Sequence, residues 1–161
     1  MKKYELTEET VTVSGKTLHR IKAVRDFGSV KAGEFGGYIE KEENLSHFGE
    51  AYVYDNAYVF GNAEVYGNAE VYGNANVSGE ACVCDTRHFF VQGPIGSRNG
   101  FVTFYRTKDD TVGVRCGCFS GSIQEFVDKV EQTHGGSRYE KEYKLAAELA
   151  KVCIRLEEEA E

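Results

Sequence analysis

The chain has 161 residues, of which 41% are hydrophobic, and it carries a net charge of −7 at pH 7. No apolar run approaches the ~18 residues that a membrane span requires, and we expect no secretion signal, because no apolar segment follows the basic start. The cysteine count of five is odd, which favours reduced thiols in the cytoplasm over a disulfide framework. We therefore expect a cytoplasmic protein that does not bind membranes.

The charge is distributed unevenly along the chain. Residues 45–85 contain six acidic and no Lys or Arg side chains, whereas residues 86–121 contain five basic and two acidic ones. Binding of a long nucleic acid requires many phosphates to be neutralised, and an acidic body argues against this class of partner. The basic segment is large enough to hold one small anion.

The first part of the chain predicts a β-hairpin. Apolar and polar residues alternate over residues 4–12 and again over 17–24, and the turn residues Ser14, Gly15 and Lys16 lie between the two runs. The following segment, residues 27–45, is rich in glycine and has apolar residues at loose spacing. We expect this segment to be an irregular entry to the next region.

Six copies of a six-residue unit then run from Ala51 to Thr86. Each unit begins with Ala, has Val two residues later, and in most cases ends in Gly-Asn or Asp-Asn. Side chains two residues apart share one face of a strand, and Gly, Asn and Asp tolerate the positive φ of a sharp corner. The pattern predicts a parallel β-helix with three units per turn, in which residues 18 apart lie above one another.

Aromatic side chains that point outward from this predicted helix are unusually frequent. There are six of them: Tyr52, Tyr54, Tyr58, Phe60, Tyr66 and Tyr72. A two-turn helix with an Ala/Val interior also buries little apolar area, and packing helices side by side would relieve both problems. We expect a homo-oligomer, above all a trimer, with these residues at its interface. The alternative is that the tyrosines satisfy strand propensity on an exposed face.

After Thr86 the six-residue pattern ends and a different module begins. Residues 88–91, 101–105 and 112–116 are strand-like. Pro94 marks a break before the second of these strands. Ser122 and Glu125 form a capping box that opens a helix, and we expect a second helix after it, with Val152 among its core-facing residues.

The predicted fold is therefore mainly β. Residues 1–86 form the N-terminal β-hairpin and a short parallel β-helix. Residues 87–161 form a C-terminal α+β module of β-strands and two helices.

The repeat resembles the hexapeptide-repeat superfamily of left-handed parallel β-helices, and the left hand is implied by that resemblance alone. Many members are trimeric acyltransferases that use acetyl-CoA or a related thioester. The segment Arg25-Asp26-Phe27, followed by Gly36 to Ser46 and the Ala-x-Val units, looks more like small phage and prophage hexapeptide-repeat proteins of uncharacterised role. Such a repeat is a strong indicator of fold and a weak indicator of function.

The resemblance implies an acyltransferase alternative, in which a histidine base faces a cleft between subunits. That base often lies beside a loop extruded from the helix, but here the units run without insertion and contain no histidine. His47 lies just before the repeat and His88 just after it, and a general base must lie within hydrogen-bond reach of its substrate. The alternative for both is a surface histidine at the end of the helix.

Two Cys-x-Cys pairs, Cys82 with Cys84 and Cys116 with Cys118, each place two thiols on one face of a strand. Four thiolates can bind zinc if the two strands meet. Zinc knuckles more often use a two-residue spacing, however, and Cys is a common small buried residue. The four histidines show no spacing for a zinc site, so we expect no metal and no cofactor.

The basic segment contains the residues that we expect to bind a ligand. They are Ser97, Arg98, Asn99, Phe104, Arg106 and Arg115. The loop around Arg98 offers backbone N–H groups, a hydroxyl, an amide and a guanidinium, a set suited to a phosphate. Nearby aromatic rings can stack on a base. The alternative is that these arginines pair with the acidic β-helix or with a neighbouring subunit.

These observations predict a non-catalytic, phage-type oligomeric binding protein that holds a small anionic, nucleotide-like ligand. In a phage-encoded protein of the host cytoplasm, such binding would sequester a signalling nucleotide of a host defence pathway. A hexapeptide-repeat acyltransferase that uses acetyl-CoA is the first alternative. A structural oligomer that docks a protein partner is the second.

Overall fold

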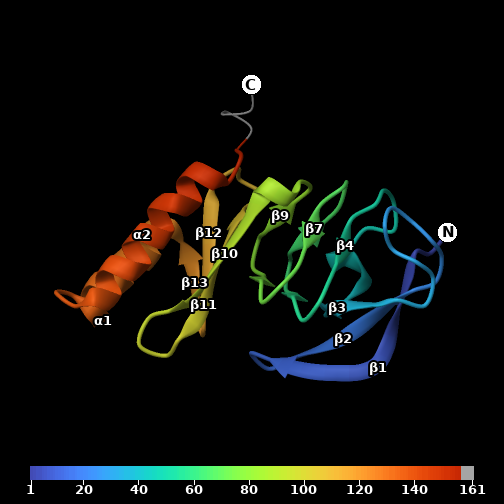
Figure 1. Cartoon of the computed structure of the whole chain (residues 1–161), viewed down its shortest axis with the longest axis horizontal. Helices are drawn as coiled ribbons and strands as arrows, with labels where there is room; N and C mark the ends of the chain where they lie inside the picture. The colour runs from blue at the N-terminus through green and yellow to red at the C-terminus, as the bar shows by residue number, and fades with distance from the viewer. Residues whose placement is uncertain (157–161) are drawn as a thin grey trace.

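The computed structural model describes residues 1–156, which form a mainly β protein with two C-terminal helices. Three parts follow one another along the chain in Figure 1: an N-terminal antiparallel sheet, the repeat region of residues 51–86, and a C-terminal sheet covered by the two helices. No helix within residues 1–156 is long and apolar enough to cross a membrane.

The predicted N-terminal hairpin is confirmed. Strands β1 (Tyr4–Val13) and β2 (Lys16–Ala23) pair antiparallel, and both turn residues between them, Ser14 and Gly15, have positive φ. The expectation of a wholly irregular segment after the hairpin is wrong. Strand β3 (Phe35–Ile39) forms there, because β2 pairs with it on one side and β5 on the other.

The repeat region consists of six two-residue strands, one in each unit. They are β4 (Tyr52–Val53), β5 (Tyr58–Val59), β6 (Glu64–Val65), β7 (Glu70–Val71), β8 (Asn76–Val77) and β9 (Cys82–Val83). Strands β4, β5 and β6 pair in parallel with β7, β8 and β9, and each pair joins residues 18 apart in sequence. The predicted stacking distance of 18 residues is therefore confirmed.

Stacking begins one layer earlier than the hexads do. Ile39 pairs with Val59 and Leu45 with Val65, so this first layer is separated from the next by 20 residues rather than 18. The short 3₁₀ turn η1 (Glu42–Asn44) lies within this layer. Buried Asn44 accepts N–H groups of its own turn and donates to Ala63 O at 2.9 Å, so its amide joins the two layers.

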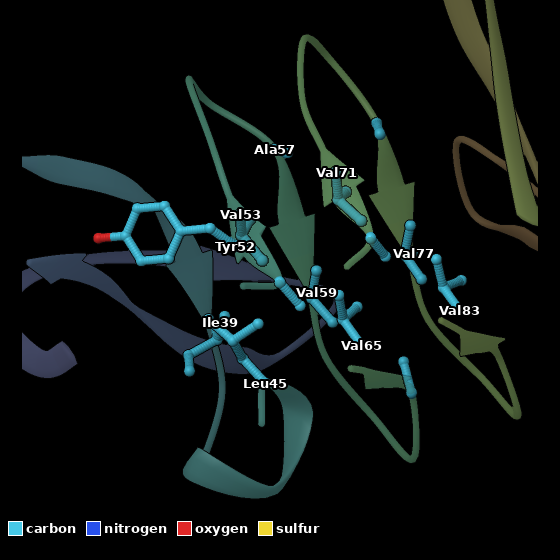
Figure 2. Packing of buried hydrophobic residues seen from close by; sticks show 14 of the residues in the cluster. Ile39, Leu45, Tyr52, Val53, Ala57, Val59, Val65, Val71, Val77 and Val83 are labelled. Atoms are coloured by element: carbon cyan, nitrogen blue, oxygen red, sulfur yellow. The ribbon is translucent and has the colours of Figure 1, made fainter. Parts of the chain in front are cut away.

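The interior of the repeat region consists of small aliphatic side chains in columns. Figure 2 shows the inward-pointing side chains of successive layers, in which paired residues such as Val53 and Val71 occupy equivalent positions in adjacent layers. Every Ala and Val that defines the repeat is at most 1% exposed. Sharp corners close the layers: Gly67 has φ +67°, and a Cβ there would approach Cys84 O to 2.8 Å. The Ala-x-Val assignment to the interior is thus confirmed.

The C-terminal sheet has the order β10 (Phe89–Ile95), β11 (Gly100–Arg106), β12 (Val112–Cys116) and β13 (Phe119–Ser122), all antiparallel. The break expected at Pro94 is confirmed in the pairing, because the register of β10 with β11 is interrupted between Gln92 and Ile95; Pro94 itself lies within the edge strand β10, where a missing N–H is tolerated. Strand β13 was not predicted. The capping box of Ser122 and Glu125 opens helix α1 (Ile123–His134) as expected, and helix α2 (Arg138–Cys153) follows.

The two faces of this sheet have different neighbours. On one face Phe104 and Val114 pack with Phe126 of α1 and Ala147 of α2 in a second hydrophobic cluster. On the other face Tyr105 joins the core of the repeat region. The hydroxyl of Thr103 accepts the Asn76 N–H at 2.9 Å. The sheet therefore caps the last repeat layer, after the short turn η2 (Thr86–His88).

Candidate functional site

The six residues predicted to bind a ligand do not form one site within the chain. Ser97, Arg98 and Asn99 lie exposed in the loop between β10 and β11, whereas Arg106 and Arg115 are buried against the N-terminal parts of the chain. Phe104 is 0% exposed in the core between the sheet and the helices, where no ligand base can stack on it. Within one protomer these residues therefore do not line a single pocket, and a pocket between subunits remains a prediction.

Arg115 connects three parts of the structure. Its Nη2 donates a hydrogen bond to Ser14 Oγ at the tip of the hairpin, and its Nε donates to Gly117 O at 3.1 Å. The guanidinium carbon lies 5.2 Å from the ring centroid of Phe60, which is a cation–π distance. These contacts hold Arg115 against a hydroxyl, a carbonyl and an aromatic ring, not against the acidic side chains or the neighbouring subunit that the alternative interpretation named.

Arg106 is the second buried arginine, and it lies on the outer side of the last repeat unit. Its Nε donates to Cys82 O at 3.0 Å. Its Nη2 lies 3.5 Å from Cys82 Sγ and 3.6 Å from Cys84 Sγ, and 3.5 Å from the hydroxyl of Tyr66. Its Nη1 lies 3.9 Å from the carboxylate of Asp110, so the guanidinium faces two thiols, a phenol and a carboxylate instead of a cavity for an anionic ligand.

The two histidines considered for acyl transfer have structural partners. His47 Nδ1 accepts the Lys3 N–H at 3.1 Å, its Nε2 bonds to Glu42 at 2.9 Å, and its ring stacks on Tyr4. Both nitrogens of His47 are therefore occupied within the chain. His88 is 8% exposed, and its Nδ1 accepts the Cys84 N–H at 3.1 Å.

The loop of Ser97–Asn99 remains accessible. Arg98 has no ion pair within residues 1–156, and Phe101 beside the loop is 40% exposed. The loop N–H of Gly96 is already taken by the carboxylate of Glu142 at 2.7 Å. This leaves the guanidinium of Arg98 as the main group that can attract an anion.

The six aromatic residues expected at an oligomer interface divide into two groups. Tyr52 and Phe60 are buried within the chain, Tyr52 beneath Phe27 and Phe60 beneath Arg115, so they were wrongly placed on the outer surface. Tyr72 is 47% exposed. The remaining three, Tyr54, Tyr58 and Tyr66, are half-buried.

A surface that the sequence interpretation missed lies on helix α2. Leu145, Leu149 and Val152 are 70%, 46% and 70% exposed, although Val152 was expected in the core. Their spacing of four and three residues places them along one face of the helix. The residues that α2 buries against the sheet are the small ones, Ala146, Ala147 and Ala150. We call Leu145, Leu149 and Val152 the α2 stripe.

A shallow open pocket of about 200 Å³ lies at one corner of the repeat region. Lys41 and Lys108 line it together with Glu43 and Glu64, and Lys108 pairs with Glu64 at 2.9 Å. The two positive and two negative charges cancel, so this pocket does not favour an anion.

The two Cys-x-Cys pairs do not combine into a metal site. Residues 1–156 contain no group of three or more His, Cys, Asp or Glu side chains placed to hold a metal ion. All five cysteines are free thiols.

Neither a protein-family model nor a curated protein sequence matches this chain.

Proposed function

We propose that the protein is a non-catalytic, homo-oligomeric binding protein built on a short left-handed parallel β-helix. The parallel strand pairs 18 residues apart support a helix of three strands per turn, and the left hand follows the resemblance to hexapeptide-repeat proteins. Copies of the chain dock on one another through the α2 stripe. The reducing cytoplasm indicated by the composition, in a phage-infected host, is the setting that we propose for it.

The observation that carries this proposal is the inverted pattern of helix α2. A helix on the surface of a protein normally buries its large apolar residues and exposes its small or polar ones. Here Ala146, Ala147 and Ala150 are buried, while Leu145 and Val152 are 70% exposed. Covering one such large side chain removes apolar area from water and is worth roughly 1.5–3 kcal/mol when burial is complete. The stripe therefore favours association.

The spacing of the stripe favours a second copy of the chain as the occupant. Leu149 lies near its centre, with Leu145 four residues before it and Val152 three residues after it. A two-fold axis beside Leu149 would pack Leu149 on its equivalent and Leu145 on Val152 of the other copy. Such a self-complementary contact is the usual form of a symmetric dimer interface. The trimer implied by the resemblance would instead use faces of the β-helix, where Tyr72 is exposed.

Native mass spectrometry of the wild-type protein and of the Leu145→Glu/Leu149→Glu variant tests this proposal. We expect the wild type to form an oligomer and the variant to be a folded monomer, because a charged stripe cannot be buried without a partner. Val24→Glu is the matched control, since Val24 is an exposed apolar residue far from α2 and 44% exposed. A monomeric wild type, or a variant that keeps the oligomer, would contradict docking through α2.

A small anionic ligand at the Ser97–Asn99 loop is a second candidate function, supported by the exposed Arg98, which has no ion pair among residues 1–156, and by the neighbouring Phe101. Sequestration of a signalling nucleotide of host defence is the role that this site would serve in a phage protein. The same mass measurements, repeated with added nucleotides and with acetyl-CoA, test it. We expect nucleotide adducts that Arg98→Ala abolishes without changing the oligomer. Uptake of acetyl-CoA alone would instead favour the acyltransferase alternative.

A further inference from the structure

A cluster of reactive groups that the proposed function does not use surrounds the last repeat unit. Cys82 begins the two-residue strand β9 on the outer side of the repeat region, Cys84 follows two residues later, and both thiols are half-buried. The same nitrogen, Nη2 of Arg106, lies within 3.6 Å of both sulfurs. A guanidinium in this position stabilises negative charge on either sulfur. Both thiols also contact the same nitrogen atom, so they lie on the same side of the strand.

His88 is placed to accept the proton of Cys84. Its Nδ1 accepts the backbone N–H of Cys84 at 3.1 Å, so this ring nitrogen is unprotonated, and it takes the thiol proton by exchanging that N–H bond for one with the sulfur. Cys84 Sγ lies 3.7 Å from the same nitrogen. A thiol beside a hydrogen-bond acceptor and a guanidinium has the surroundings that convert a cysteine into a nucleophile.

Tyr66 supplies a proton on the other side of the cluster. Its hydroxyl lies 3.3 Å from Cys82 Sγ. The hydrogen bond with Cys82, together with burial, raises the pKa of Tyr66, so its hydroxyl keeps its proton at neutral pH. It can therefore donate a hydrogen bond to an oxygen atom that arrives at the sulfurs.

The second Cys-x-Cys pair provides an internal comparison with the same spacing. Burial raises the pKa of the Cys116 thiol, and Cys118 is exposed on a turn. Within residues 1–156, no guanidinium or imidazole forms a hydrogen bond with either sulfur. The residues around Cys82 and Cys84 are therefore particular to that site and do not follow from the Cys-x-Cys spacing.

We propose that Cys82 and Cys84 form a redox-active dithiol site that reacts with hydroperoxides, with Cys84 as the attacking thiol and Cys82 as the resolving one. This inference does not depend on the proposed function. His88 takes the Cys84 proton, and the thiolate sulfur attacks the terminal oxygen of the hydroperoxide. The O–O bond breaks, the alkoxide leaves and takes the proton that His88 holds to become the alcohol, and Cys84 becomes a sulfenic acid.

The second step forms the disulfide between Cys82 and Cys84. Cys82 Sγ attacks the sulfur of the sulfenic acid, its S–O bond breaks, and the oxygen leaves as water with the hydroxyl hydrogen and the Cys82 proton. The balance is two thiols and one hydroperoxide giving one disulfide, one alcohol and one water. The two sulfurs are oxidised and the peroxide oxygens are reduced, so no further reactant is needed.

Oxidation of the intact chain by tert-butyl hydroperoxide at neutral pH tests the proposal. Alkylation followed by peptide mass spectrometry reports each cysteine pair separately, and a disulfide appears as the loss of two hydrogen masses. We expect the Cys82–Cys84 disulfide to form about tenfold faster or more than any oxidation of Cys116 and Cys118. Equal rates at the two pairs, or no disulfide at Cys82 and Cys84, would overturn it.

Single variants separate the roles of the two thiols. In Cys82→Ser, Cys84 should accumulate a sulfenic acid that dimedone traps, whereas Cys84→Ser should leave Cys82 unreactive. The reverse result would overturn the assignment of the attacking thiol. Arg106→Gln should slow oxidation, and Arg106→Lys should restore part of the rate because it keeps the charge. Because Arg106 is also buried, His88→Gln and Tyr66→Phe provide independent variants, and oxidation at the wild-type rate in both would overturn the roles given to these residues.

Discussion

The repeat region and the C-terminal module stabilise their interiors in different ways. In the repeat region every layer contributes the same small Ala and Val side chains, and each contacts its equivalent one layer away. In the C-terminal module a few large rings meet, with Phe104 contacting both Phe90 and Phe126. Stability is therefore spread evenly over the first region and concentrated in a few residues of the second.

Truncation of core side chains should lower the free energy of unfolding most, and the loss should differ between the two regions. Phe104→Ala removes a ring that is 0% exposed, and we expect a loss of about 4 kcal/mol in the free energy of unfolding. Val71→Ala, at a site that is also 0% exposed, should cost only about 2 kcal/mol, because it removes two methyl groups and leaves a smaller cavity. Urea denaturation of both variants measures the difference, and equal losses would contradict the comparison.

Removal of the Arg115 side chain, which contacts both regions, should cause the next largest loss in the free energy of unfolding. Arg115→Ala removes a buried charged group that bonds to Ser14 and Gly117 and covers Phe60, and we expect it to cost about 2–3 kcal/mol. Arg98→Ala, in the exposed loop, should change the free energy of unfolding by no more than about 0.5 kcal/mol. A comparable cost at the two positions in thermal or urea unfolding would mean that Arg115 does not join the regions.

The smallest expected effect is a pH dependence of the free energy of unfolding. It arises from Lys3, which is buried at the other end of the repeat region. Its Nζ donates to Ala51 O at 2.5 Å, and burial lowers the pKa of Lys3 to about 8. Between pH 8 and 10 the unfolded chain keeps a proton that the folded chain has released, so the free energy of unfolding should rise with pH. We expect a gain of about 2 kcal/mol relative to Lys3→Met over that range.

Denaturation in a reducing buffer at each pH measures this difference between wild type and Lys3→Met. The variant serves as the control, because the other groups that titrate in this range are common to both proteins. A difference that stays constant or shrinks from pH 8 to pH 10 would contradict the effect of burial on Lys3.

The parts of the fold that the sequence predicted are those in which one pattern repeats or one short motif decides. The Ala-x-Val period defined the interior of the repeat region, and Ser122 with Glu125 defined the start of α1. Strand β3 could not be predicted, because its residues form a strand only through pairing with β2 and β5 on either side. Pro94 could not be placed at a sheet edge before the order of the strands was known.

The candidate sites were less predictable, for a physical reason. Charge along the chain indicated a basic segment, but it did not reveal that Arg106 and Arg115 point back onto the repeat region and the hairpin. The α2 stripe had a signal in its spacing, yet alanines on the opposite face gave the helix a second apolar side. Only contact with the sheet decides which side is buried.

The hydrogen bond between Ser14 and Arg115 ties the length of the hairpin to the length of the repeat region. In Figure 1 the hairpin starts at the N-terminal end and extends beneath the layers to the C-terminal sheet. An added layer of 18 residues would extend a repeat of this kind without changing its interior, and would move the sheet by ~4.8 Å. A hairpin of fixed length would then no longer reach Arg115. The number of layers is thus set by a strand pair outside the repeat.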